Sequence, residues 1–127
     1  MYECDADAYE KELQSVFGDG LPRFDLMFLG LGSDGHTASL FPGKPALEVT
    51  DRLVTYVPEP GLPPPHSRVT VTFPVLNNAA LALFLVAGED KRPRVEQILE
   101  GGDIPAARVQ AERTIILANR AAAEGLE

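Results

Sequence analysis

The stretch Leu29–Gly43, LGLGSDGHTASLFPG, places four glycines, one aspartate and one of the chain's two histidines between an apolar run and a Pro-Gly turn. The residues leading into it, Phe24–Gly30 (FDLMFLG), form a nearly unbroken apolar run, which is typical of a strand covered on both faces in an α/β sheet. We therefore expect a central strand that ends in a flexible glycine loop. That loop would display Ser33, Asp34 and His36 at the carboxyl end of the strand, where open α/β sheets bind ligands.

The rest of the chain predicts strands in alternation with helices. Apolar runs indicate strands, apolar residues at helical spacing indicate helices, and the proline-rich stretch Pro58–Ser67 favours an extended connection. In the stretch that follows, Val69, Val71 and Phe73 alternate with Thr70 and Thr72, which predicts a half-buried strand. The alternation implies an α/β fold, a three-layer α/β/α arrangement with a mostly parallel, Rossmann-like sheet, in one unit over residues 1–127. The expected elements are strands at 24–30, 68–74, 81–88 and 113–119 and helices at 5–17, 76–79 and 91–102.

Composition excludes several classes of function. The chain has 127 residues, enough for one hydrophobic core, and its net charge of −8 argues against a nucleic acid or an anionic membrane as partner. No apolar run is long enough to span a bilayer. The single cysteine, Cys4, cannot form an internal disulfide, so a cytoplasmic location is expected. With two histidines thirty residues apart and no cysteine cluster, we expect neither a metal nor another cofactor.

The glycine loop also contains a match to a dinucleotide-binding fingerprint. Residues Gly30–Gly35 read G-x-G-x-x-G directly after the predicted strand. However, Pro42 and Gly43 follow too soon to leave room for the crossover helix that such a site needs. Asp51 does not lie at the end of a credible second strand, where a ribose-binding acid is required. The glycines are therefore expected to let the backbone approach another kind of ligand.

The stretch FDLMFLGLGSDGHTASLFPG resembles the signature of the 6-phosphogluconolactonase family, whose members hydrolyse 6-phosphoglucono-δ-lactone. The resemblance continues, in the family's order, through PPPHSRVTVTFPVLNNA, LFLVAGEDK and ILEGGDIPAARVQ. The chain departs from the family at Ser33, where proline is frequent, and at Ile116 and Asn119, where tryptophan and aspartate are common. It resembles only the C-terminal half of the family's chains. Their N-terminal half carries a glycine-rich phosphate loop and an Asp-Glu-Arg motif that this chain lacks.

The related glucosamine-6-phosphate deaminases carry a similar Asp-Gly-His loop. In them an isoleucine follows the histidine, and a glutamate of the ring-opening relay lies five positions beyond it. Here those positions hold Thr37 and Phe41. The resemblance therefore favours the lactonase over the deaminase.

The resemblance implies catalytic roles for His36 and Asp34. Lactone hydrolysis needs a water made nucleophilic, and an imidazole with an ordinary pKa near ~6.5 is largely a free base at neutral pH. Asp34, two residues away, would orient the imidazole or bind the sugar. The alternatives are that His36 only braces a turn and that Asp34 bonds its own backbone in that turn.

The substrate's phosphate is expected to bind Arg68 and Lys91, which match basic positions of the family. Lys91 opens a predicted helix, where free N–H groups already favour an anion. The alternatives are an arginine that caps the sheet edge and a lysine on a solvated helix face, and the solvated face is the expectation for Arg92 and Arg94. The backbone of Gly32, Ser33 and Gly35 would complete the substrate site, and His66 is placed on the loop surface without a catalytic role.

The sequence thus predicts hydrolysis of 6-phospho-D-glucono-1,5-lactone, a small sugar phosphate, without metal or cofactor. Two alternatives remain: a catalytically inactive fragment that binds sugar phosphates or assembles with other chains, and deaminase or isomerase chemistry on a hexose phosphate. Because the expected central strand would lose a neighbour in a half-length chain, we also expect a homo-oligomer or pairing with the absent N-terminal half.

Overall fold

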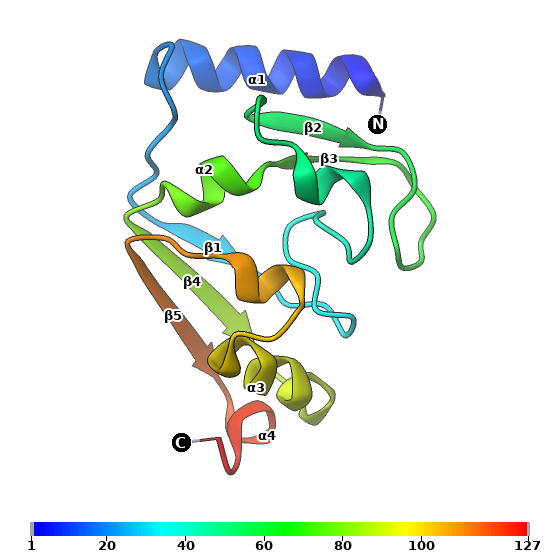
Figure 1. The fold of residues 1–127 in the computed structure, drawn as a ribbon, viewed down its shortest axis with the longest axis vertical. Coiled ribbons are helices and arrows are strands. Elements are labelled where there is room, and N and C mark those ends of the chain that lie inside the picture. The colour runs from blue at the N-terminus through cyan, green and yellow to red at the C-terminus, as the bar shows by residue number, and fades with distance from the viewer. Residues whose placement is uncertain (1, 127) are drawn as a thin grey trace.

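The structure of the chain, a computed structural model, describes residues 2–126 (Figure 1). Three of its strands form one parallel sheet and two others form a separate antiparallel hairpin. The elements in chain order are α1 (Glu3–Phe17), β1 (Met27–Leu29), η1 (Pro45–Glu48), β2 (Val54–Val57), β3 (Arg68–Val71), α2 (Phe73–Asn77), β4 (Leu81–Val86), η2 (Glu89–Lys91), α3 (Arg92–Glu100), η3 (Pro105–Arg108), β5 (Arg113–Ala118) and α4 (Arg120–Ala123), where η denotes a short 3-10 helix.

The parallel sheet has the strand order β1-β4-β5, so β4 is its central strand. Phe28 of β1 pairs with Leu83 of β4, which pairs in turn with Ile115 of β5. The parallel α/β architecture confirms the predicted fold class. The prediction that the strand before the glycine loop is central is wrong for this chain, because among residues 2–126 β1 pairs only with β4 and forms a sheet edge.

The sheet has one covered face and one open face. On the covered face Ala82, Phe84 and Val86 of β4 are buried, and α3 and η3 lie over the sheet in Figure 1. Side chains on the open face alternate with these along each strand, as the two-residue period of a strand requires. They include large apolar groups that are well exposed, among them Phe28 (63%), Leu117 (60%) and Leu85 (49%).

The hairpin of β2 and β3 packs against α1, which lies beyond it at the far end of the molecule from α4 (Figure 1). The sequence analysis assigned no strand to β2. It predicted a half-buried strand at β3, where Thr70 and the following Thr72 are the buried side chains and Val69 and Val71 are partly buried against α1. Hydrogen bonds explain the burial of the two threonines. The Thr70 hydroxyl accepts a hydrogen bond from the Ser39 N–H (3.1 Å), and the Thr72 hydroxyl donates one to the Arg52 carbonyl (2.7 Å).

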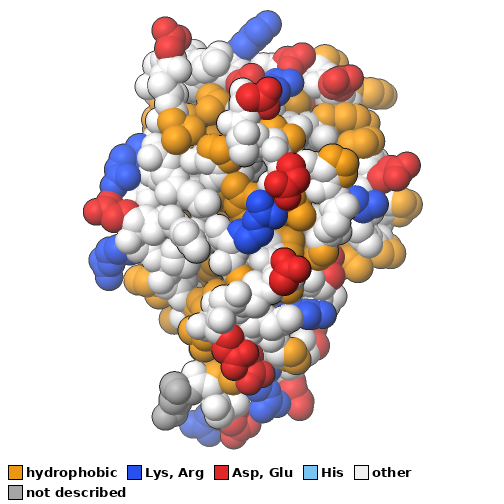
Figure 2. Space-filling model, in the orientation of Figure 1, with side chains coloured by type: hydrophobic (Ala, Val, Ile, Leu, Met, Phe, Trp, Pro, Cys, Tyr) orange, Lys and Arg blue, Asp and Glu red, His pale blue; other side chains and the backbone are white. Residues whose placement is uncertain are grey.

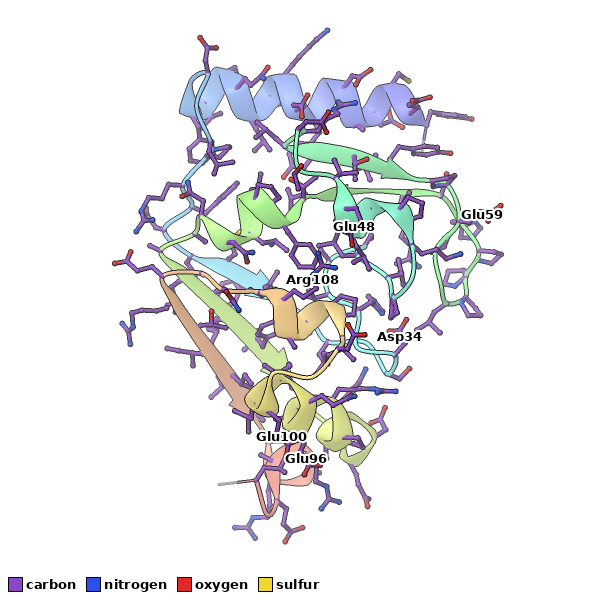
Figure 3. The ribbon with its side chains drawn as sticks, viewed as in Figure 1. Asp34, Glu48, Glu59, Glu96, Glu100 and Arg108 are labelled. Atoms are coloured by element: carbon purple, nitrogen blue, oxygen red, sulfur yellow. The ribbon has the colours of Figure 1, made fainter. Side chains whose placement is uncertain are left out.

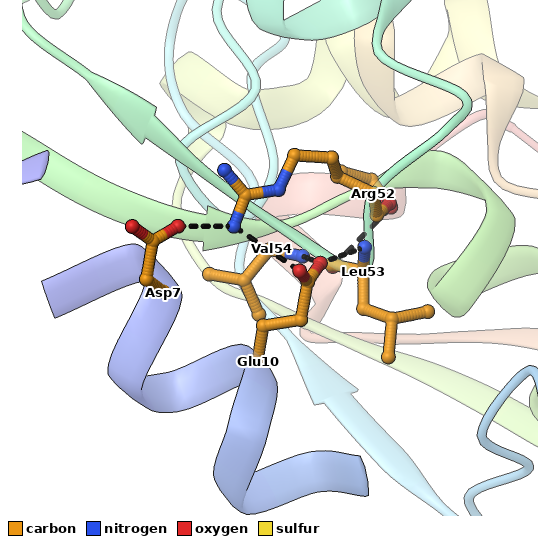
Figure 4. Close-up of polar contacts among 6 residues, drawn as sticks. Asp7, Glu10, Arg52, Leu53 and Val54 are labelled. Atoms are coloured by element: carbon orange, nitrogen blue, oxygen red, sulfur yellow. Dashed lines mark hydrogen bonds and ion pairs between the residues drawn. The ribbon is translucent and has the colours of Figure 1, made fainter. Parts of the chain in front are cut away.

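One carboxylate of α1 fastens this helix to β2 (Figure 4). Glu10 accepts hydrogen bonds from the backbone N–H groups of Leu53 (2.6 Å) and Val54 (3.2 Å), and Arg52 bridges Glu10 and Asp7. Burial would raise the pKa of Glu10, but the hydrogen bonds from Leu53, Arg52 and Val54 outweigh it and hold the pKa below its ordinary value of 4.5. Glu10 is thus a charged anchor for α1.

The face of the molecule shown in Figure 2 carries charges of both signs. On the face shown in Figure 2, acidic and basic side chains are interspersed with apolar ones. Arg108 illustrates the mixing: its guanidinium pairs with Glu48 (3.4 Å) and lies over the Phe73 ring, and Arg108 and Glu48 are labelled in Figure 3. None of the helices over residues 2–126 is long and apolar enough to cross a membrane.

Candidate active site

The loop after β1 lies beyond the carboxyl end of a parallel strand, and Figure 3 labels Asp34 within it. This loop is held by its surroundings, which corrects the expectation of flexibility. Three of its carbonyl oxygens, at alternate residues, accept hydrogen bonds from the segment 91–106. The pairs are Leu31 with the Lys91 ammonium (2.7 Å), Ser33 with Arg94 Nε (2.8 Å) and Gly35 with the Ala106 N–H (3.0 Å).

Asp34 and His36 form a close pair inside this loop. His36 Nδ1 lies 2.6 Å from Asp34 Oδ1, and the same oxygen accepts a hydrogen bond from the His36 backbone N–H at 3.0 Å. The imidazole also stacks on the buried Phe41 ring, with 4.4 Å between centroids. The two polar side chains are about one-fifth exposed. The imidazole is therefore fixed by one nitrogen and one ring face.

The ionisation of Asp34 decides which nitrogen of the imidazole is available. Burial would raise the pKa of Asp34, but the hydrogen bonds from the His36 backbone and ring outweigh it, so the pKa lies below its ordinary value of 3.8. An ionised carboxylate only accepts hydrogen bonds, so the proton between the two groups is carried by Nδ1. In the neutral imidazole Nε2 is then left as a base, which is the arrangement used for general-base catalysis.

Two glycines of the loop are required by packing. A Cβ at Gly32 would lie 2.0 Å from His36 Nδ1 and 2.8 Å from Asp34 Oδ1, so any side chain there would displace the pair. Gly35 has a φ of +89°, and a Cβ there would lie 2.7 Å from Ile104. Substrate contacts by Gly32, Ser33 and Gly35 stay a prediction.

His36 and Lys91 meet at one hollow of the surface. The ammonium of Lys91 donates to the Leu31 carbonyl and has further N–H groups for a ligand. The hollow has a volume of about 420 Å³, within the range of sites for small molecules. Its lining consists of Gly30, Leu31, Gly32, His36, Thr37, Ala38 and Lys91.

Arg68 lies near this hollow but does not line it. Its guanidinium carbon is 5.4 Å from the centre of the Phe41 ring, on which His36 also stacks. The structure therefore brings His36 and Lys91 together and links Arg68 to them through Phe41. Phe41 occupies the position at which the sequence analysis noted a missing deaminase glutamate.

Arg94 is the site residue that the sequence analysis missed. It was expected on a solvated helix face together with Arg92. Arg92 does bond to exposed groups, Glu89 and the Glu124 carbonyl, whereas Arg94 reaches the glycine loop. The signal in the sequence was spacing, since Arg94 follows Lys91 by three residues, the separation that brings side chains to one helix face. His66 is exposed, as expected.

Residues 2–126 hold no cluster of three or more metal-ligating side chains. The fold and the loop together define an α/β protein whose candidate general base lies at the carboxyl edge of a parallel sheet. The family described as glucosamine-6-phosphate isomerases/6-phosphogluconolactonase matches residues 2–117, and the chain belongs to this family.

Curated relatives narrow the comparison to one branch of the family. The 6-phosphogluconolactonase of rat is 45% identical over 108 residues, which is 83% of this chain and 42% of the relative. That of Synechocystis is 42% identical over an alignment of 132 positions, covering 98% of this chain and 53% of the relative. The chain thus spans about half the length of the curated relatives that it matches.

Solved structures of 6-phosphogluconolactonases also superpose on this chain. A 6-phosphogluconolactonase from Trypanosoma brucei superposes with a TM-score of 0.84 and 31% identity, over 100% of this chain and 56% of that chain. One from Thermotoga maritima superposes with a TM-score of 0.77 and 37% identity, over 89% of this chain and 49% of that chain. A monomeric glucosamine-6-phosphate deaminase, with a TM-score of 0.70 and 22% identity, shares the fold.

Proposed function

We propose that this chain carries the base and a phosphate-binding part of a site that hydrolyses 6-phospho-D-glucono-1,5-lactone. The observation that supports this most is the Asp34–His36 pair, which leaves Nε2 of His36 as a base beside a hollow that also contains an ammonium group. The activity for which the relatives are named supplies the substrate class. The proposed reaction is hydrolysis of a ring ester by water.

In the proposed mechanism His36 Nε2 takes a proton from water as the water oxygen bonds to the lactone carbonyl carbon. The carbonyl oxygen becomes an oxyanion, which collapses as the bond between that carbon and the ring oxygen breaks. The ring oxygen leaves as a hydroxyl after it receives the proton held on the imidazole. Asp34 stabilises the transient imidazolium and keeps the ring oriented, so no other acid is needed.

The phosphate of the substrate is proposed to bind Lys91 and Arg68. Lys91 lines the hollow and retains N–H groups beyond the one that it gives to Leu31. The Arg68 guanidinium lies over the Phe41 ring. In that position it would bind the phosphate of a substrate that extends past His36. Hydrogen bonds from both cations would fix the lactone at one end, while its ester carbon lies beside the imidazole.

The test is the rate of acid release from freshly prepared 6-phosphogluconolactone, after subtraction of spontaneous hydrolysis. We expect His36→Ala to lower the catalysed rate by about 10²–10⁴, the usual contribution of a general base. His66→Ala is the matched control, because it removes the chain's other imidazole from an exposed loop, and it should leave the rate unchanged. Equal rates for the parent chain and His36→Ala would contradict the proposed role.

The second candidate is an inactive sugar-phosphate-binding or assembly fragment, which the half-length match favours. It predicts that the chain binds 6-phosphogluconate, measured by calorimetry, without accelerating lactone hydrolysis. Deaminase chemistry is a third candidate and predicts release of ammonia from glucosamine 6-phosphate. The buried Phe41 beside His36 argues against it, since no carboxylate occupies that position.

We also infer that the open face of the sheet pairs with polypeptide equivalent to the remaining half of the relatives. The open face carries an apolar surface formed by Phe28, Leu85 and Leu117, and its exposure to water is unfavourable. The relatives have about twice the length of this chain. Light scattering of the chain alone distinguishes the outcomes. A dimer would indicate self-pairing through this face, and a monomer that binds a separately produced N-terminal half would support the proposed pairing.

A further inference from the structure

The Ser33 carbonyl has a partner that the proposed mechanism does not use. Arg94 in α3 donates to it from Nε at 2.8 Å, and the Nη1 of the same guanidinium donates to Gln97 Oε1 at 2.6 Å. Gln97 belongs to the same helix, so the guanidinium is oriented by α3 and directed at the loop. Arg94 is partly buried and is not among the residues that line the hollow.

This contact acts on the peptide group that joins Ser33 to Asp34. Because a peptide group is planar, fixing its carbonyl oxygen also fixes the direction in which the chain enters Asp34. Asp34 in turn holds His36 through two hydrogen bonds to one carboxylate oxygen. A continuous set of contacts therefore runs from α3 through Arg94 and the loop backbone to the imidazole.

We propose that Arg94 is a positioning residue that holds the Asp34–His36 pair in place through the Ser33 carbonyl. The inference rests on the proposed function, in which this pair acts on the lactone. Lys91 makes the equivalent contact with Leu31 but also lines the hollow, so its two roles cannot be separated by substitution. Among residues 2–126, Arg94 bonds to the loop backbone and to Gln97 and does not line the hollow, which makes it the cleaner probe.

Two variants isolate the hydrogen bond from charge and bulk. Arg94→Gln keeps an N–H donor at the same distance along the side chain as Nε, whereas Arg94→Met has the same length without a donor there. Both variants lose the positive charge, so a difference between them reports the hydrogen bond alone. Arg92→Met is the control, since it removes an arginine from the first turn of the same helix without touching the loop.

The first measurement is amide hydrogen exchange in the full chain. The reporters are the Gly35 N–H, which bonds to the Gly32 carbonyl, and the His36 N–H, which bonds to Asp34. Phe84 in β4 is the reference, because exchange of a buried strand amide reports global unfolding and should not change when the effect is confined to the loop. We expect the ratio of loop exchange to Phe84 exchange to rise about tenfold in Arg94→Met, the effect of losing one hydrogen bond to a charged group, and to stay within about twofold in Arg94→Gln and Arg92→Met.

The second measurement is the pH titration of the Asp34 carboxyl by NMR, which a purely structural contact elsewhere would not move. His36 is the titratable group in contact with Asp34, and Lys91 and Arg94 bring two cations to the same loop. Loosening of the pair in Arg94→Met should raise the pKa of Asp34 toward 3.8, whereas Arg94→Gln should retain the parent value. Equal behaviour of the two variants in both measurements would overturn the proposal.

Neither measurement depends on catalysis, so the outcome is separate from that of the proposed function. If the chain hydrolyses the lactone, Arg94→Met should lower kcat about tenfold with little change in KM, and Arg94→Gln should restore it. If the parent chain is inactive, the proposed function of the isolated chain fails while the exchange ratio and the Asp34 titration still decide the role of Arg94. An unchanged ratio in Arg94→Met refutes that role whatever the activity.

Discussion

Replacing Gly32 with alanine would insert a methyl group into the Asp34–His36 pair. The added Cβ would lie 2.0 Å from His36 Nδ1, 2.2 Å from Cε1 and 2.8 Å from Asp34 Oδ1. Ordinary contacts begin near 3.4 Å, so the imidazole would have to move by about 1.4 Å. Backbone strain does not contribute, because the φ of Gly32 lies outside the left-handed region. A displacement of about 1 Å in a reacting group costs about 10²-fold in rate, so we expect at least that loss.

The assay is acid release from the phosphorylated lactone, read beside the NMR titration of Asp34. Because the hydrogen bonds from His36 lower the pKa of Asp34, displacing the imidazole should raise that pKa toward 3.8. Gly20→Ala is the matched control, since a Cβ at Gly20 meets open space, its φ is also not positive and Gly20 does not line the hollow. A Gly32→Ala variant that kept the parent rate and the parent pKa of Asp34 would refute the argument that this glycine makes room for the pair.

Three further substitutions test the site and the fold. Asp34→Asn should lower the hydrolysis rate by about 10² or more with KM little changed, because an amide neither fixes the tautomer nor stabilises the imidazolium. Lys91→Met should lower kcat/KM for 6-phosphogluconolactone about 10- to 100-fold more than it lowers kcat/KM for unphosphorylated gluconolactone, because only the first lactone loses a charge-assisted hydrogen bond to its phosphate, while both are affected by loss of the contact with Leu31. An equal loss on both lactones would argue against phosphate binding. Glu10→Gln should lower the free energy of unfolding near pH 7 by about 1–2 kcal/mol in urea titrations. Because the folded-state pKa of Glu10 lies below the unfolded value of 4.5, its contribution is present above that value and is lost as the pH falls through the folded pKa. The parent and Glu10→Gln should therefore converge in acid, and Glu12→Gln on the exposed side of α1 should match the parent throughout.

Sequence predicted the elements whose signals are local. The apolar run of β4 and the strand β5 were found at nearly their observed bounds. The helix α3 was found with both of its ends, because Pro93 lies in its first turn and Gly101 adopts the left-handed conformation (φ +71°) that ends many helices. Asp34 and His36 were singled out because they lie in a glycine loop that follows a strand and resembles a family signature, and the structure places them in contact.

What sequence did not predict depends on partners far along the chain. The sequence of an apolar strand is the same whether the strand lies at the centre or at the edge of a sheet. The edge position of β1 therefore depends on which other strands pair with it. Likewise Thr70 of β3 and Thr72 just after it are buried because they meet the Ser39 N–H and the Arg52 carbonyl, which no local pattern reveals. Arg94 is an intermediate case: its three-residue spacing from Lys91 is a local signal, but its partner, the Ser33 carbonyl, lies far along the chain.

The glycine loop gives the sharpest contrast between composition and structure. Four glycines in fifteen residues indicate flexibility, yet two of them, Gly32 and Gly35, are buried, and each excludes a side chain for a specific steric reason. Carbonyl groups of the same loop are bound by Lys91 at Leu31 and by Arg94 at Ser33. A loop already fixed in this way loses little conformational entropy when a ligand binds, so more of the binding energy remains available to orient the ligand. The high glycine content here therefore serves a preorganised site.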